Sequence, residues 1–213
     1  MIRGLIRFLL WTAILLGALV AALRFTAIRW WRVPDADPFL EASIAPTLRA
    51  GDLVLLWRFT PPKFGDLVLC PEPNAPERVV IGRLVGEAGD ELSVNGQEVR
   101  VNNRAMSTER RCEPRSFSVI DPDVGTEVTQ DCDVEALGGH LHMRGSTSGH
   151  LAPKPFSKTI SEGMAFLLSD NRLYPYDSRD YGSVERITCK ETVIFRIAPK
   201  EGFNSPRRLT FIQ

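Results

Sequence analysis

The sequence has no net charge, because its 213 residues carry 26 basic and 26 acidic side chains. This balance excludes the basic surface that binds a phosphate backbone, so no nucleic-acid partner is expected. Internal repeats and low-complexity tracts are also missing, and long helical patterns are few. With 15 prolines and 16 glycines scattered along the chain, the sequence predicts a mostly β fold.

Histidine is scarce, and the chain has only three, which are His140, His142 and His150. The spacing of His140 and His142 would place both rings on one face of a strand. No cysteine or carboxylate stands at ligand spacing beside them, however. We therefore expect surface or packing histidines, and we predict neither a metal site nor a cofactor.

One long apolar run is present, at residues 8–23. As a helix it would be about 24 Å long, and flanking Arg7 and Arg24 could extend it toward the roughly 30 Å of a bilayer core. We interpret residues 1–32 as a membrane anchor with its interface. Small residues at 20–22 leave a cleaved signal peptide open as the second interpretation. Basic residues flank both ends of the run, so charge alone does not give its orientation.

The segment that follows places a serine before a proline. Pro46 favours extended or turn geometry just after Ser43, and an apolar run at residues 53–57 predicts a strand. The sequence thus predicts a hydroxyl at a rigid corner beside a strand. Taken alone, this pattern is equally typical of an ordinary turn.

Further strands are predicted at residues 64–70 and 78–85, and residues 91–101 alternate around an Asn-Gly pair that is typical of a hairpin. The next stretch, residues 102–158, is less regular and predicts an inserted, smaller subdomain of strands and loops. The main β domain would then consist of residues 33–101 and 159–213.

Four blocks, taken in order, resemble the type I signal peptidases, which are membrane-bound serine endopeptidases with a Ser-Lys dyad. The blocks are residues 43–52 (SIAPTLRAGD), 64–68 (FGDLV), 82–90 (GRLVGEAGD) and 166–172 (FLLSDNR) with 177–182 (DSRDYG). The resemblance implies an antiparallel β-sheet domain behind one N-terminal transmembrane helix. It also implies a place in the cell (inner) membrane, with the N-terminus cytoplasmic and the main domain on the extracytoplasmic side.

The same resemblance implies that Ser43 is the nucleophile, but Gly82 occupies the position of the general-base lysine. The serine that would orient that lysine corresponds to Pro175. Glycine cannot take a proton from a hydroxyl, and Arg83 stays protonated in proteins. The chain's lysines are interpreted as solvated surface charges, and they are Lys63, Lys154, Lys158, Lys190 and Lys200.

Three functions therefore stay open. The protein is an active serine endopeptidase acting on the signal peptides of exported preproteins, or a pseudoprotease that binds exported chains or a partner peptidase without cleaving. A purely structural membrane protein is the third interpretation. In each case the lipid bilayer is an expected partner.

By resemblance, a substrate peptide would add as an extended strand beside Val79, Val80 and Ile81, near Ala42, with small residues in shallow pockets. The resemblance also gives supporting roles to two clusters of polar residues. They are Asp170, Asn171, Arg172, Asp177, Ser178 and Arg179.

The four cysteines allow three pairings. In an extracytoplasmic compartment a bridge from Cys112 to Cys132 would close the loop-rich insertion. Cys70 and Cys189 lie in predicted strands, where a bridge and two buried free thiols are equally good interpretations.

Overall fold

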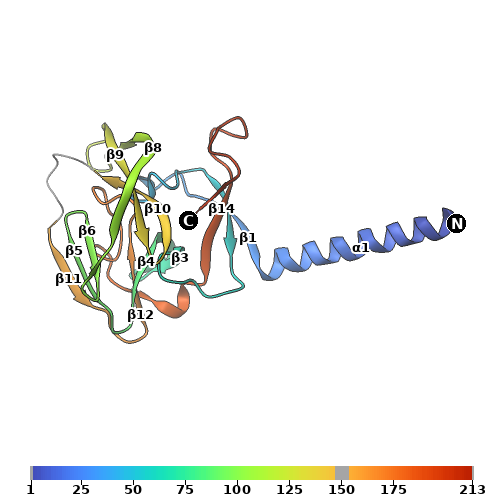
Figure 1. Cartoon of the computed structure of the whole chain (residues 1–213), viewed down its shortest axis with the longest axis horizontal. Coiled ribbons are helices and arrows are strands. Elements are labelled where there is room, and N and C mark those ends of the chain that lie inside the picture. Colours follow the sequence, from blue (N-terminus) through green and yellow to red (C-terminus); the bar gives the residue numbers. More distant parts are fainter. Residues whose placement is uncertain (1, 147–153, 213) are drawn as a thin grey trace.

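The computed structural model describes residues 2–146 and 154–212, so His150 lies outside the described residues. Helix α1 (Ile2–Thr26) projects away from a β-rich body (Figure 1). Its stretch Arg3–Thr26 is long and apolar enough to cross a membrane, and none of it is buried against the body. These 24 residues give about 36 Å of helix, more than the bilayer core needs. The helix is longer than predicted because it includes the arginines before the apolar run.

An eight-stranded sheet forms the centre of the body, in the order β1-β2-β14-β3-β4-β12-β13, with β15 paired to β14. Every pairing in it is antiparallel, which confirms the predicted mostly β class. Its strands are β1 (Ile28–Arg32), β2 (Leu53–Trp57), β3 (Leu67–Glu72), β4 (Ala75–Glu87), β12 (Met164–Leu168), β13 (Val184–Glu185), β14 (Glu191–Ala198) and β15 (Thr210–Phe211).

Two smaller antiparallel sheets pack beside the central one. The first has the order β11-β5-β6-β7, from β5 (Glu91–Asn95), β6 (Glu98–Val101), β7 (Arg104–Ala105) and β11 (Phe156–Thr159). The second has the order β10-β9-β8, from β8 (Ser107–Ile120), β9 (Glu127–Leu137) and β10 (His140–Ser146). The predicted Asn-Gly hairpin joins β5 to β6, and Gly96 there has the positive φ of 59° that such a turn requires.

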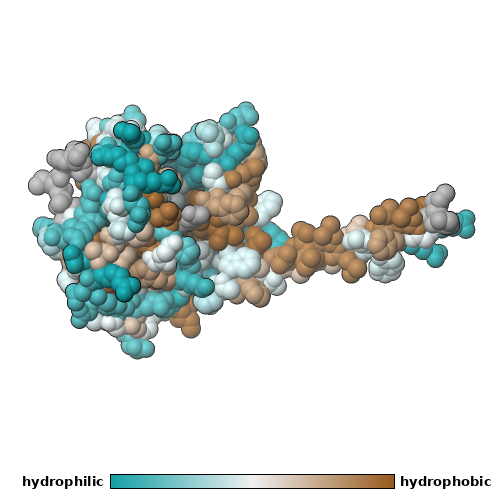
Figure 2. Space-filling view, in the orientation of Figure 1, coloured by the Kyte–Doolittle hydropathy of each residue, from teal (hydrophilic) through white to brown (hydrophobic). Residues whose placement is uncertain are grey.

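Apolar side chains cover both faces of the central sheet, because residues alternate between the faces of a strand. On one face, Leu40 and Ile44 of helix α2 (Pro38–Ile44) pack in a cluster with Ile81 of β4. On the other face, Val80 and Leu84 of β4 belong to a second cluster. Helix α2 therefore lies on the Ile81 face alone. Figure 2 shows brown, apolar residues along α1 and on the body beside the base of that helix.

All four cysteines are paired. Cys112 and Cys132, the pair expected from the sequence, join β8 to β9. Cys70 of β3 joins Cys189, directly after the 3₁₀ helix η1 (Arg186–Thr188), with a Cα–Cα distance of 4.6 Å. The free-thiol interpretation of Cys70 and Cys189 is thus wrong, because the sheet brings positions 119 residues apart into contact.

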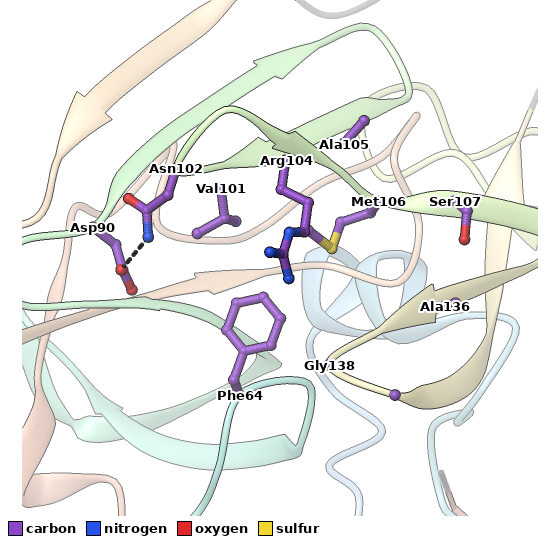
Figure 3. Close-up of a pocket in the computed structure, with 11 residues that line it drawn as sticks. Phe64, Asp90, Val101, Asn102, Arg104, Ala105, Met106, Ser107, Ala136 and Gly138 are labelled. Atoms are coloured by element: carbon purple, nitrogen blue, oxygen red, sulfur yellow. Dashed lines mark hydrogen bonds between the residues drawn. The ribbon is translucent and has the colours of Figure 1, made fainter.

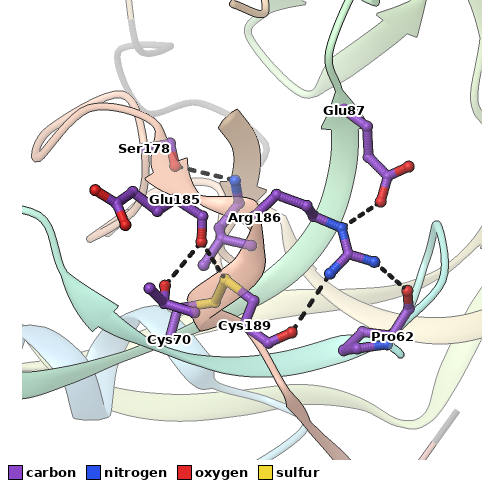
Figure 4. The surroundings of a disulfide bond; sticks show 9 residues. Pro62, Cys70, Glu87, Ser178, Glu185, Arg186 and Cys189 are labelled. Carbon is purple, nitrogen blue, oxygen red and sulfur yellow. Dashed lines mark hydrogen bonds and ion pairs between the residues drawn. A yellow bond between two sulfur atoms is a disulfide. The ribbon is translucent and has the colours of Figure 1, made fainter. Parts of the chain in front are cut away.

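An arginine holds the segment around the second bridge (Figure 4). The guanidinium of Arg186 pairs with Glu87 of β4 and donates to the carbonyl oxygen of Pro62 at 2.6 Å. It also donates to the carbonyl oxygen of Cys189 at 3.4 Å. Disulfide and arginine together fasten the chain after β13 to the centre of the sheet.

Candidate functional site around Ser43

Ser43 lies in the last turn of α2 rather than in the turn that the sequence predicted. Asp37 caps this helix, since its carboxylate accepts a hydrogen bond from the backbone N–H of Leu40 at 3.0 Å, and Pro38 begins it. These two start signals explain why the chain is helical here. The Ser43 side chain is fully buried, and its hydroxyl donates to the carbonyl oxygen of Leu40 at 2.9 Å.

Asn171 fixes the end of α2 from the opposite side. Its side-chain amide donates to the carbonyl oxygen of Ala42 at 2.9 Å, and its backbone N–H donates to that of Ser43 at 2.9 Å. Its side-chain oxygen accepts from the backbone N–H groups of Leu173 and Tyr174. The predicted supporting residue therefore holds the serine segment directly, through Ala42 and Ser43.

Asp170 and Arg83 form a buried, two-point ion pair. The carboxylate accepts from Nε and Nη2 of Arg83 at 2.9 and 3.1 Å, and both side chains are almost fully buried. Burial alone would raise the pKa of Asp170, but the positive charge of Arg83 outweighs it and holds that pKa below its usual value. Arg83 is thus fully engaged in the core.

Buried charges continue from this pair into the three-stranded sheet. Glu135 of β9 pairs with Arg172, with Arg144 at 3.2 Å and with Nε2 of His142 at 3.3 Å. Burial opposes its ionisation, but these neighbours, Arg172 above all, lower the pKa of Glu135 to about 2. The pKa of His142 is lowered, first by burial and then by the charge of Arg83, so the ring is neutral at pH 7.

His142 is therefore a packing residue inside an ionic network that joins β4 to β9 and β10. Sequence reasoning missed this network because its members lie on four separate segments: β4, β9, β10 and the loop after β12. No group of three or more potential metal ligands occurs among residues 2–146 and 154–212.

The second supporting cluster holds the loop after β12. Asp177 accepts from the backbone N–H of Ser169 at 2.9 Å and from the guanidinium of Arg179 at 2.9 and 2.7 Å. Burial opposes ionisation of Asp177, but Arg179 lowers its pKa. The hydroxyl of Ser178 accepts from the backbone N–H of Leu167 at 3.0 Å. These hydrogen bonds fix the loop to β12, and none of them involves Ser43.

Gly82 lies in a position with little space for a side chain. It pairs with Val68 of β3, and alternation directs it to the face of Val80 and Leu84, opposite to the face that α2 covers. A Cβ atom there would lie 3.0 Å from Cβ of Leu167 and 3.3 Å from the carbonyl oxygen of Leu168.

None of the lysines is buried in the core, where it could replace the base missing at position 82. Lys63, Lys154, Lys190 and Lys200 are exposed, and Lys158 is half-buried. A lysine acts as a general base only where burial or a neighbouring charge depresses its pKa. Their surroundings are those of solvated surface charges.

The edge of β4 beside Val79–Gly82 is unpaired. Strand β12 pairs with β4 only from Glu87 to Arg83, and β3 occupies the other side of β4. Within the described residues, no strand therefore pairs with the outer edge at Val79, Val80 and Ile81. The side chain of Val79 is 38% exposed, whereas those of Val80 and Ile81 are buried. A peptide at this edge would therefore contact mainly the backbone of β4.

A cavity of about 590 Å³ lies apart from these residues (Figure 3). Phe64, Arg104 and Met106 line it, and Asn102 there donates to Asp90 at 2.8 Å. None of the predicted catalytic, supporting or binding residues contributes to its wall.

Comparison with known proteins finds one family model, described as signal peptidase, peptidase S26, which matches residues 5–197. Signal peptidase I V of Bacillus subtilis (strain 168) is 24% identical over 147 residues, which cover 67% of this chain and 73% of that protein. A crystal structure of a signal peptidase I from Enterococcus faecalis V583 matches with a TM-score of 0.42 and 19% identity, covering 63% of this chain and 97% of that one.

Proposed function

The chain belongs to the signal peptidase family, peptidase S26, and on that premise we propose that it binds signal peptides of exported preproteins without cleaving them by itself. The observation that carries this proposal is the tight position at Gly82, where a side chain would have to displace Leu167 or Leu168 of β12. Pro175 likewise has no hydroxyl to orient such a base. In this proposal, cleavage is left to a partner peptidase.

The state of Ser43 supports the same proposal. Its hydroxyl is buried and donates to the main-chain carbonyl of Leu40. In this arrangement no general base accepts the proton of the Ser43 hydroxyl. A second candidate, an active serine endopeptidase, is favoured by the retained serine and by Asn171, which fixes it. The two differ in one measurable property, the cleavage of a preprotein.

Peptide binding is proposed to use the unpaired edge of β4. Backbone hydrogen bonds along an exposed strand edge recognise extended peptides of many sequences. Val79 on this edge is exposed, whereas Ala42 of α2 is buried and held by Asn171. As the family resemblance implies, we expect small side chains in the bound peptide.

We predict that a photo-crosslinking amino acid introduced at Val79 captures a signal-peptide analogue with an Ala-x-Ala site, whose two alanines are the small residues. The matched control places the same amino acid at Val124, an exposed valine in the turn between β8 and β9. Crosslinks are measured by mass spectrometry on the full chain in detergent. Equal capture at both positions would contradict binding at β4.

The main domain is proposed to lie on the extracytoplasmic side of the cell (inner) membrane, with α1 as an uncleaved anchor. Both disulfides support this side, because the cytoplasm keeps most thiols reduced. Exposed aromatic residues near the end of α1, Phe25, Trp30 and Phe59, would lie against the lipid interface.

Protease added to intact spheroplasts should therefore digest everything after α1 and leave a small anchored fragment. A tag at the C-terminus reports the digestion, and a cytoplasmic protein must survive in the same sample. A protected C-terminal tag would contradict the proposed side. A mature N-terminus near Arg24 would instead show that the segment is cleaved.

A further inference from the structure

Five side chains meet at the start of the unpaired β4 edge. Arg78 of β4 pairs with Asp37 at 2.8 Å and with Glu72 at 3.4 Å, and its guanidinium carbon lies 5.5 Å from the ring centre of Tyr176. The hydroxyl of Tyr176 donates to Glu72 at 2.9 Å. Phe39 completes the group, with its ring centre 6.2 Å from that of Tyr176. We call these five residues the clasp.

The clasp joins elements that lie on opposite faces of the central sheet. Asp37 caps α2, which packs in the cluster of Ile81, whereas Tyr176 packs against the cluster of Val80 on the other face. A contact between the two faces must pass around an edge of β4. Because β3 occupies one side of β4 and contributes only Glu72 to the clasp, the link from Asp37 through Arg78 to Tyr176 passes around the unpaired side.

This position limits the unpaired edge at both ends. β12 begins to pair at Arg83, and the clasp closes the edge at Arg78. Between them lie the four residues Val79–Gly82, which extend over about 13 Å at the rise of a strand. A peptide can therefore form ladder hydrogen bonds over only a short stretch before it meets the clasp.

We propose that the clasp determines how long a segment of peptide pairs with β4, and so makes the protein specific for a short extended segment. This inference rests on the proposed function, because it assigns a length limit to the same edge. Arg78 is 46% exposed, and ion pairs of such residues are weakened by salt. The clasp is therefore a closure that a single substitution can open.

The test measures the affinity of a peptide series for the full chain in detergent by fluorescence anisotropy. The peptides share an Ala-x-Ala end and carry four, eight or twelve residues in total. With the native protein, affinity should stop rising after the four-residue peptide. With Arg78→Gln, affinity should continue to rise, by at least about fivefold for the longest peptide, because further backbone groups can pair.

Two further variants separate the clasp from general effects. Asp37→Asn keeps a side-chain oxygen for the helix cap but loses the charge that holds Arg78, so it should behave as Arg78→Gln does. Arg110→Gln removes an exposed arginine of β8 and should behave as the native protein does. Faster amide hydrogen exchange at residues 75–82 in Arg78→Gln and Asp37→Asn, but not in Arg110→Gln, would show directly that the edge has opened.

The outcomes distinguish the two proposals. Peptide binding with the same length dependence in native protein, Arg78→Gln and Asp37→Asn would overturn the clasp and leave peptide binding intact. No binding of any peptide to any variant would overturn the proposed function, and the length limit with it. A gain with Arg110→Gln equal to that with Arg78→Gln would attribute the effect to net charge and also overturn the clasp.

Discussion

Purified native protein should leave a preprotein with an Ala-x-Ala site uncut, at the same background rate as its Ser43→Ala variant. A serine hydroxyl becomes an effective nucleophile only when a base accepts its proton. Loss of that base costs up to about 10⁶ in rate, or about 8 kcal/mol of activation free energy. Here the buried Ser43 hydroxyl donates to the carbonyl oxygen of Leu40 instead. Cleavage is measured by gel with purified full chain and with an active signal peptidase as positive control.

Restoring the missing groups should give unequal gains. Gly82→Lys alone should recover little, because the new Cβ would meet Leu167 at 3.0 Å and the side chain would start on the face opposite α2. An unoriented lysine also stays protonated near neutral pH. Adding Pro175→Ser should help more, since a hydroxyl near the amine could orient it. The double variant combined with Ser43→Ala is the matched control.

The decisive contrary result is efficient cleavage by the native protein that Ser43→Ala abolishes. It would show that Ser43 is activated by a base outside position 82, and that the buried arrangement around Leu40 changes when a peptide binds. The clasp would then select substrates for cleavage rather than peptides for binding alone.

Local signals in the sequence were sufficient for the elements that depend on neighbouring residues. The apolar run predicted α1, the alternation around Gly96 predicted the hairpin, and residues 53–57 coincide with β2. Helix α2 was missed, although Asp37 and Pro38 form a start signal for it.

Features that depend on the tertiary fold were not predictable in this way. The resemblance predicted supporting roles for Asp170 and Arg172, but not their connection through Glu135 to His142. These carboxylates and cations come together only when β9 and β10 pack beside β4. A pattern of neighbouring residues holds no information about such pairing.

The bridge between Cys70 and Cys189 should contribute more to stability than the one between Cys112 and Cys132. A disulfide stabilises a fold chiefly by restricting the unfolded chain, and more so for a longer loop. With separations of 119 and 20 residues, this chain-entropy relation gives about 5 and about 3 kcal/mol. The first value is a large part of the 5–15 kcal/mol that typical domains have in total.

The experiment compares urea unfolding of the full chain in detergent for Cys70→Ala/Cys189→Ala and for Cys112→Ala/Cys132→Ala. Each double substitution leaves no unpaired thiol, so the second variant is a matched control for the first. We expect a loss larger by about 2 kcal/mol in the first variant, because that bridge fastens the chain after β13 to β3 across most of the β domain. Equal losses would contradict a loop-length effect. A larger loss for the pair on β8 and β9 would show that the three-stranded sheet, with its ionic network to Arg83 and Asp170, limits the stability of the whole domain.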